Sequence, residues 1–360
     1  MPIKVGADLG NAESMLAWGA RQRSLKRLPS YLGSGAAAEL TRLTAGGRSE
    51  AAGVAADLVL VYEGVELFVG DLAIRQSQDA TSGRGDVGRY WSGHTKRLFL
   101  TMCGQAWPGQ HMQLYVVTGL PVEVWSEENA AKVAHNLMGM SEYVLGGQKQ
   151  KTTVLGVLVV MEGAGAGAQL GGDDPDLEEA PLDIGGRTTL AYWTRAQEPI
   201  LAKCGQLDAG VEKIGDNLSA WFEQTYGRPL RLFERRDLIR HALDPKAHPH
   251  PKIHVAGKLI TITSQLRAEV QRVGDEIASF VKRIWRSSER GAVAAEAASV
   301  HLVGGGAYYF GDTIRAIIPN IIIPDMPEAQ NAYGYLSIAQ AIGDDEWADI
   351  IEACKAPEAR

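Results

Sequence analysis

The sequence has few of the residues that stabilise secreted or membrane-embedded proteins. It contains three cysteines, Cys103, Cys204 and Cys354, which are far apart and include no Cys-x-x-Cys pair. This pattern argues against a disulfide framework and a zinc knuckle, so the thiols are expected to stay reduced. No apolar run approaches the roughly 20 residues of a membrane helix, and no basic and apolar leader precedes the first strand pattern. We therefore expect a cytoplasmic protein without a membrane partner.

The chain also has fewer basic residues than acidic ones, 36 against 43. The formal net charge is −7, and binding to nucleic acid needs a concentrated positive face for the phosphates. Direct nucleic-acid binding is therefore not expected, and any link to DNA would be indirect or local. The 360 residues, 45% of them hydrophobic, exceed one ordinary core and predict two domains, each with its own sheet.

A weak internal repeat divides the chain into two similar halves. The strand-like run 3–8 ends in Asp8-Leu9-Gly10, and the run 181–183 ends in Asp183-Ile184-Gly185. Each is followed by a short turn and a second strand-like run, which predicts a β-hairpin with an acidic residue at the bend. The second strands are expected at Ser14–Trp18 and Thr188–Trp193.

Other segments carry weaker signals. The Gly- and Ala-rich stretch 33–56 and a strand pair near 58–69 predict a small variable subdomain. The segment 244–251 contains three prolines and two histidines; it is interpreted as a solvated loop, with metal ligation by its histidines as the alternative. Apolar residues at helical spacing predict amphipathic helices from Val211 to Tyr226 and from Ile262 to Ile284.

The two predicted hairpin tips suit the binding of phosphate. Small residues allow successive backbone N–H groups to approach one anion, and Gly10, Gly185 and Gly186 meet that need. Asp8 and Asp183 would repel a phosphate unless a cation intervened, so they are interpreted as partners of Mg²⁺ through its waters. A single Asp-x-Gly is an ordinary turn, but its repetition in matching contexts favours a function.

A third candidate is the run Gly304, Gly305 and Gly306 between a buried strand at 300–303 and a helix expected at 308–318. Such a turn lets the backbone lie flat against the base, ribose or phosphates of a nucleotide. The alternative is a glycine-rich connection at the end of a strand.

Three motifs together resemble the phosphate-one, phosphate-two and adenosine motifs of the actin-like ATPases. They are Val5–Asn11, Asp183–Thr189 and Leu302–Ala307, in the family's order and spacing. Within that superfamily the chain is most similar to the ParM or StbA type, bacterial actins that segregate plasmids. The local features that indicate this type are Thr118–Pro121, the Arg-Thr-Thr after the second glycine pair, and Asn331–Tyr335.

The resemblance implies an α/β, actin-like fold, a duplicated ribonuclease H-like architecture with a nucleotide cleft between two domains. Residues 1–162 with 331–360 would form domain I, and residues 163–330 would form domain II. ATP or ADP with Mg²⁺ would be the cofactors. The residues expected to contact the nucleotide, besides the glycines and aspartates above, are Asn11, Arg187 and Thr188.

The resemblance also implies a catalytic carboxylate that orients the attacking water, and Glu162 occupies the corresponding place, with Asp183 as its partner in catalysis. Relatives often have proline before this glutamate, whereas this chain has Met161. The alternative for Glu162 is a residue that starts a helix. Arg187 stands in the second hairpin, where it either neutralises phosphate or is a solvated turn residue.

The sequence therefore predicts an ATPase that polymerises into filaments and segregates plasmid DNA through a DNA-bound adaptor protein. A small-molecule kinase of the same fold is the first alternative, because fold alone does not exclude it. A scaffold that uses ATP as a switch without polymerising is the second.

Overall fold

The computed structural model describes residues 2–38, 58–83, 86–170, 177–196, 198–286 and 291–355. The chain forms two compact units: unit 1 comprises residues 1–169 and 331–360, and unit 2 comprises residues 170–330. The sequence places the expected boundary after residue 162, whereas nearly all of the short helix α6 (Ala164–Leu170) belongs to unit 1. Most of the expected variable subdomain, residues 39–57, lies outside the described residues.

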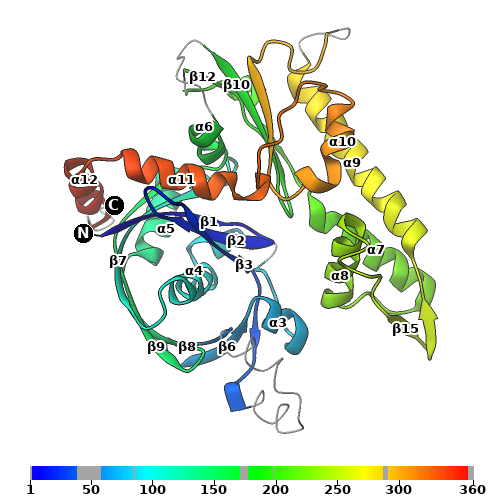
Figure 1. Cartoon of the computed structure of the whole chain (residues 1–360), viewed down its shortest axis with the longest axis horizontal. Helices are drawn as coiled ribbons and strands as arrows, with labels where there is room; N and C mark the ends of the chain where they lie inside the picture. Colours follow the sequence, from blue (N-terminus) through cyan, green and yellow to red (C-terminus); the bar gives the residue numbers. More distant parts are fainter. Residues whose placement is uncertain are drawn as a thin grey trace. The chain divides into compact units, whose positions relative to one another are not determined.

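Unit 1 is built on a mixed sheet that curls around helix α4, as Figure 1 shows. The strand order is β3-β2-β1-β7-β9-β8-β5-β6-β4, with β1, β7 and β9 parallel to one another. The strands are β1 (Ile3–Leu9), β2 (Glu13–Trp18), β3 (Ser24–Pro29), β4 (Leu32–Ser34), β5 (Val59–Tyr62), β6 (Val65–Val69), β7 (His111–Leu120), β8 (Gly139–Leu145) and β9 (Gln148–Met161). The helices are α3 (Asp71–Gln76), the 3₁₀ helix η1 (Val87–Trp91), α4 (Gly93–Ala106), α5 (Glu127–Leu137), α6, α11 (Gln330–Ala341) and α12 (Asp344–Lys355).

Helices cover both faces of this sheet because its central strands are apolar on both sides. Along β7, Leu114 and Val116 belong to the core that α4 and α5 complete, whereas Val117 packs with Tyr335 of α11 and Trp347 of α12. Side chains alternate between the faces of a strand, so neighbouring residues of β7 serve opposite layers. The strand is thereby fixed in the middle of a three-layer unit.

Unit 2 contains a second sheet with its own core. Its strand order is β13-β12-β10-β11-β14, and β17 pairs in parallel with β10. The strands are β10 (Glu178–Ile184), β11 (Thr189–Ala191), β12 (Thr194–Arg195), β13 (Glu198–Pro199), β14 (Gly205–Leu207), the separate hairpin β15 (Ile253–Val255) and β16 (Lys258–Ile260), and β17 (Ser299–Val303). The helices are η2 (Leu201–Lys203), α7 (Val211–Tyr226), α8 (Leu232–Leu243), α9 (Thr263–Trp285), α10 (Ala307–Arg315) and η3 (Pro327–Ala329).

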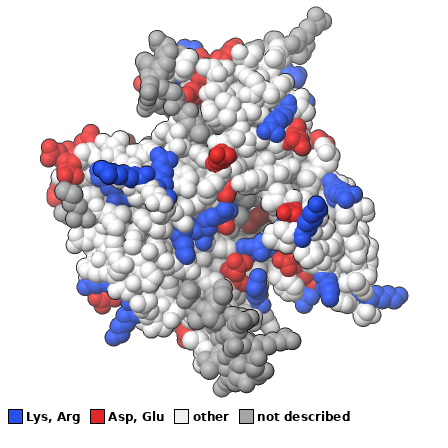
Figure 2. Space-filling view, in the orientation of Figure 1, with Lys and Arg blue, Asp and Glu red and all other residues white. Residues whose placement is uncertain are grey.

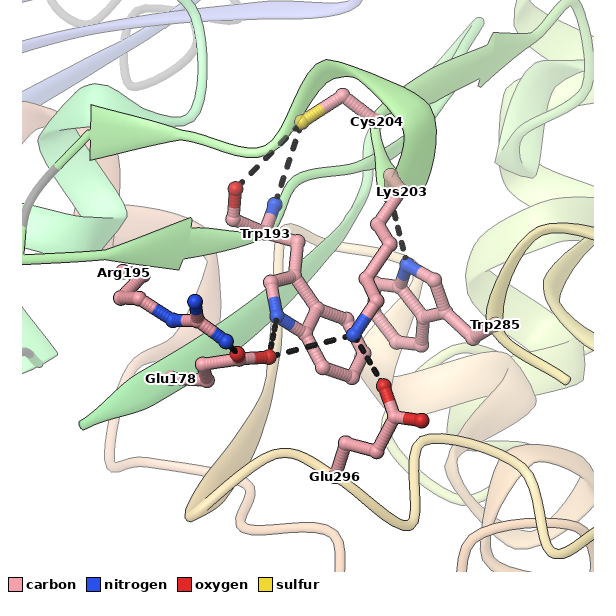
Figure 3. A network of polar contacts seen from close by, with 7 residues as sticks. All are labelled: Glu178, Trp193, Arg195, Lys203, Cys204, Trp285 and Glu296. Carbon is pink, nitrogen blue, oxygen red and sulfur yellow. Dashed lines mark hydrogen bonds and ion pairs between the residues drawn. The ribbon is translucent and has the colours of Figure 1, made fainter. Parts of the chain in front are cut away.

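A network of polar contacts at the start of β10 fastens the edge of this sheet to α9 (Figure 3). Glu178 accepts hydrogen bonds from the indole N–H of Trp193 at 2.8 Å and from Lys203 at 3.2 Å, and it pairs with Arg195. The Lys203 ammonium lies 4.0 Å from the centre of the Trp193 ring, and the Lys203 carbonyl accepts from Trp285 of α9.

The surface and the cysteines agree with the composition. On the face shown in Figure 2, acidic and basic side chains are interspersed and do not form one broad positive area. The three cysteines are free thiols, and burial raises the pKa of Cys103 far above its ordinary value. Within the described part of the chain, no helix combines the length and apolar character that crossing a bilayer requires.

His94 is held as a neutral ring in the first turn of α4. Its Nε2 lies 3.2 Å from the carbonyl oxygen of Ser30, so Nε2 carries the proton and donates it to that oxygen. Burial, followed by the positive charge of Arg89, lowers the pKa of His94 from 6.5 to about 4. The ring therefore stays uncharged in the folded protein at neutral pH.

This low pKa predicts a loss of stability in mild acid. Between pH 6.5 and about 4, the unfolded chain binds a proton at His94 that the folded chain does not, so stability falls as the pH falls through this window. His94→Gln keeps a donor for Ser30 but cannot titrate. The wild type should lose about 2 kcal/mol more than His94→Gln between pH 7 and 4.5, measured by urea unfolding. His111→Gln, at an exposed histidine of β7, is the control; equal pH dependence in wild type and His94→Gln would contradict the assignment.

Candidate nucleotide-binding site

In unit 1, two of the predicted site carboxylates lie at one edge of the sheet and on one face. The registers align Ala7 with Thr118 and Thr118 with Val159, so the carboxyl ends of β1, β7 and β9 meet. Asp8 is in phase with Gly6, whose Cα faces α11, and Glu162 follows β9 in phase with Val160. Strand spacing and rise place the two Cα atoms roughly 12 Å apart. Both side chains are partly exposed.

Gly10 and Asn11 form the turn between β1 and β2. A Cβ at Gly10 would lie 2.6 Å from the carbonyl oxygen of Glu13, so only glycine fits this bend. The Gly10 carbonyl accepts a hydrogen bond of 2.7 Å from the Ser30 hydroxyl, and the Ser30 amide donates to Ala12 at 3.0 Å. The turn is thus tied to the segment that follows β3.

Arg89 also contacts this turn, although no sequence pattern indicated it. Its side chain is 2% exposed, and its guanidinium donates to the side-chain oxygen of Asn11 and to the carbonyls of Leu9 and Gly10. It lies in η1, far from the motif in the sequence, and a single arginine in a short 3₁₀ helix has no periodicity or spacing that marks it. Only the tertiary structure brings it to the site.

In unit 2, the second hairpin places Asp183 beside a tight turn. Asp183 is the last but one residue of β10 and is 8% exposed. The Gly185 amide donates to the Thr188 carbonyl at 2.8 Å and closes the turn. The carbonyls of Gly185 and Gly186 accept hydrogen bonds of 3.1 and 2.7 Å from the first two amides of α7. A side chain at Gly210, which precedes α7, would collide with these carbonyl groups.

The glycine run after β17 lies against Asp183 because β17 and β10 are parallel neighbours. Gly304 has a φ of 81°, and a Cβ there would collide with the Asp183 carboxylate. The Gly306 amide donates to the Ile184 carbonyl at 2.7 Å. A Cβ at Gly305 would meet no described protein atom within 4 Å. The chain's own packing therefore explains glycine at 304 and 306 but leaves Gly305 open to a ligand.

Arg187 and Thr188 complete the predicted residues of unit 2. Arg187 Nε lies 3.0 Å from a carboxylate oxygen of Asp208, in an ion pair at the surface of unit 2. Thr188 contributes the backbone carbonyl that closes the turn. A solvent-exposed ion pair of this kind contributes little stability, so Asp208 can release Arg187 to an anionic ligand at low cost.

Two sequence features that suggested the ParM type are packing features of unit 1. In Thr118–Pro121, a side chain at Gly119 would collide with the Tyr335 ring. In Asn331–Tyr335, a side chain at Gly334 would collide with the backbone of Gly165, and the Asn331 side chain accepts from the Ala166 amide. These glycines therefore allow helix α11 to pack closely against the sheet and α6.

One histidine of segment 244–251, His250, has structural partners for both ring nitrogens. His250 Nδ1 donates to the Pro251 carbonyl, and its Nε2 accepts from the Ile262 amide at 3.3 Å. The His241 ring contacts the His250 ring at 5.3 Å. Among the residues that the structure describes, no group of three or more His, Cys, Asp or Glu is arranged to hold a metal ion.

Family models match most of the chain. Residues 6–165 match the N-terminal domain of actin-like proteins. Residues 182–316 match the C-terminal domain of the archaeal, MreB-like actin homologues. No curated protein sequence matches.

Solved structures resemble the whole chain. A ParM filament from Clostridium botulinum is 20% identical over 95% of this chain and 99% of that chain, with a TM-score of 0.74. The archaeal actin homologue Ta0583, in complex with ADP, is 18% identical over 94% of this chain and 100% of that chain, with a TM-score of 0.69. The predicted actin-like two-domain α/β fold is confirmed, and the two family models together show that the chain belongs to the actin-like proteins.

Proposed function

We propose that the protein binds Mg-ATP, hydrolyses it slowly and assembles into filaments in the cytoplasm. One observation carries the nucleotide part of this proposal. In each unit an aspartate, Asp8 or Asp183, is the last but one residue of a central strand, and the carbonyls of the turn that follows accept hydrogen bonds from neighbouring elements. Turns of this kind present amide groups to an anion. Each unit therefore offers one phosphate-binding turn, and the ADP complex of a structurally similar protein supports the nucleotide as the ligand.

The aspartates suit Mg²⁺ better than a metal held by protein alone. Mg²⁺ keeps several waters and is usually bound through one or two carboxylates together with substrate phosphates. Asp8 and Asp183 supply one carboxylate in each unit, and the described residues contain no larger cluster of ligands. When bound, Mg²⁺ would neutralise charge on the phosphate oxygens. The chain's own part is to hold two carboxylates at the ends of buried strands.

Glu162 is the proposed group that orients the attacking water. It follows the buried strand β9, its amide donates to the Leu120 carbonyl at 2.7 Å, and it lies on the face that carries Asp8. Phosphoryl transfer requires little covalent help from the protein, so a carboxylate that aligns one water can contribute much of the rate. The rigid attachment of Glu162 to β7 and β9 supports this role.

The glycine run of unit 2 is the proposed site of the nucleoside. Gly304 and Gly306 lie against Asp183 and Ile184, which keeps the loop next to the phosphate turn. Gly305 has open space where a side chain would stand. A nucleotide can therefore approach the backbone of this loop closely, whereas a larger residue would block it.

Filament formation is proposed from the likeness to a ParM filament. A head-to-tail contact that does not close into a ring produces a filament. By the same likeness we propose that the filament segregates plasmid DNA through a DNA-bound adaptor protein. The mixed charge on the face in Figure 2 supports an adaptor over direct contact with DNA.

Removal of either aspartate tests the metal assignment. Asp8→Asn and Asp183→Asn should weaken Mg²⁺-dependent ATP binding about 10- to 100-fold, because each loses a carboxylate that faces the metal's waters. The measurement is a titration with a fluorescent ATP analogue, with and without Mg²⁺. Asp312→Asn, at a fully exposed residue of α10, is the control. Wild-type Mg²⁺-dependent affinity in both variants would refute the assignment.

Glu162→Gln should separate binding from hydrolysis. The turns and the aspartates remain, so ATP affinity should stay within about threefold, while phosphate release falls about 100-fold or more. Filaments of this variant should persist longer. Glu142→Gln, at an exposed residue of β8, is the matched control. Unchanged phosphate release would exclude the catalytic role, and lost ATP affinity would show a structural one.

Assembly should depend on the nucleotide state. If loss of the γ-phosphate relaxes the conformation that assembles, sedimentation should recover filaments with Mg-ATP or a nonhydrolysable analogue and far fewer with ADP. Identical pelleting with ATP, with ADP and without nucleotide would contradict the mechanism. Phosphate transfer to small-molecule hydroxyl acceptors without any pelleting would identify a kinase.

A further inference from the structure

The turn at Gly10 and Asn11, the first proposed phosphate turn, accepts hydrogen bonds from the buried side chain of Arg89. Arg89 Nη2 donates to the carbonyl of Leu9 at 3.2 Å and to the carbonyl of Gly10 at 2.9 Å, and Nη1 donates to the Asn11 side chain. Asn11 is fixed further by a hydrogen bond of 3.3 Å to the Tyr90 hydroxyl. One guanidinium thus contacts three successive residues of the turn.

The backbone at Arg89 is itself held in place by hydrogen bonds. η1 is capped by Asp86, whose carboxylate accepts from the Gly88 amide at 2.8 Å. The Arg89 carbonyl accepts from the hydroxyls of Ser92 and Thr95, at 2.8 and 2.6 Å, and these residues cap and begin α4. The side chain therefore extends from a rigid base, and its donors cannot move far from the turn.

The contacts set the direction of the amide groups. In a trans peptide the carbonyl and the N–H point in opposite directions. A hydrogen bond from Arg89 to the Leu9 carbonyl therefore directs the Gly10 amide away from the guanidinium, and the bond to the Gly10 carbonyl does the same for the Asn11 amide. Ser30 strengthens the second of these by donating to the same carbonyl at 2.7 Å.

We propose that Arg89 is a positioning residue that holds the Gly10 and Asn11 amides toward the phosphates of the nucleotide. The inference rests on the proposed function. Arg89 donates to the carbonyls of Leu9 and Gly10, so it acts through the direction of two peptide groups. Amides that are aligned before the phosphate arrives bind it without the cost of ordering the turn.

Unit 2 reaches the same arrangement by other means. The carbonyls of Gly185 and Gly186 accept from the first amides of α7, so no arginine is needed there. In both turns two successive carbonyls are held by neighbouring groups, which directs the amides of the same peptide groups, Gly10 and Asn11 in unit 1 and Gly186 and Arg187 in unit 2, the opposite way. Because a side chain in unit 1 and helix amides in unit 2 give the two turns the same orientation of peptide groups, we infer that this orientation serves the same purpose in both, the binding of phosphate.

The planar guanidinium suits this task better than an ammonium group. It presents several N–H donors in a fixed fork, so it can contact three acceptors at once, whereas lysine is a flexible point charge. Its positive charge also lies behind a turn that is proposed to hold an anion. Arg89→Lys should therefore recover only part of what Arg89→Met loses.

The test compares ATP with adenosine, which has no phosphate. Arg89→Met fills the same space without donors and should weaken ATP binding roughly 10- to 100-fold, while adenosine binding stays within about twofold. Equilibrium dialysis with labelled ATP and adenosine gives both affinities, and circular dichroism and thermal melting verify folding. Arg27→Met, at a half-exposed arginine of β3 that pairs with Glu13, is the matched control.

Chemical rescue provides a second readout. Arg89→Ala removes a buried guanidinium side chain, so guanidinium ion added to the solution should enter the space left behind and restore part of the ATP affinity. It should not restore Arg89→Met, whose side chain fills the cavity. If Arg89→Met does not fold, Arg89→Lys takes its place in the comparison of ATP with adenosine.

The outcomes separate the two proposals. A wild type that binds no ATP overturns the proposed function and the inference together. A wild type that binds ATP, with a folded Arg89→Met that binds it equally well, overturns the inference alone. Equal losses of ATP and adenosine binding in the variant also overturn it, because they show a general structural role.

Discussion

A backbone amide can donate to a phosphate only if the carbonyl of its own peptide group points elsewhere. This constraint governs both candidate phosphate turns. A carbonyl that points into the protein needs a donor there, since an unsatisfied buried carbonyl is costly. In unit 1 the donors are Arg89 and Ser30, and in unit 2 they are the first amides of α7. The elements that surround each turn are thus part of the site, although they do not reach the ligand.

Strand pairing decides where these turns lie. β1 and β10 are each central strands with a parallel neighbour, β7 in unit 1 and β17 in unit 2. Within each unit the two parallel strands have their carboxyl ends at the same edge of the sheet. The parallel pairing places Gly304 beside Asp183 and brings Glu162 to the face of Asp8. Buried strands on both sides also restrict the movement of their ends. The carboxylates are therefore fixed by the core and not by loops.

The sequence could predict those site residues that a local pattern marks. It could not predict the residues that only the tertiary structure brings to the site. Asp8, Gly10, Asp183 and the glycine run stand at strand ends, which the alternation of apolar residues reveals, and the internal repeat marks two of them. Arg89 is 79 residues from Gly10, and nothing in its neighbourhood distinguishes it. The sequence also could not show what each glycine makes room for: Gly119 and Gly334 make room for other parts of unit 1, whereas a Cβ at Gly305 would meet no atom of the described residues within 4 Å.

The two turns differ in how strongly their structure depends on the side chains of the residues that hold them. In unit 2 the holding groups are backbone amides of α7, which every residue type except proline provides. In unit 1 the holding groups are two side chains, and one of them carries a buried charge whose hydrogen bonds depend on the guanidinium fork. Loss of one side chain can therefore loosen the first turn, whereas side-chain changes at Val211 or Glu212 leave the two amides that hold the second turn in place unless they introduce proline. Phosphate affinity at the first turn can therefore be tuned by substitutions outside the turn itself, at Arg89 or Ser30.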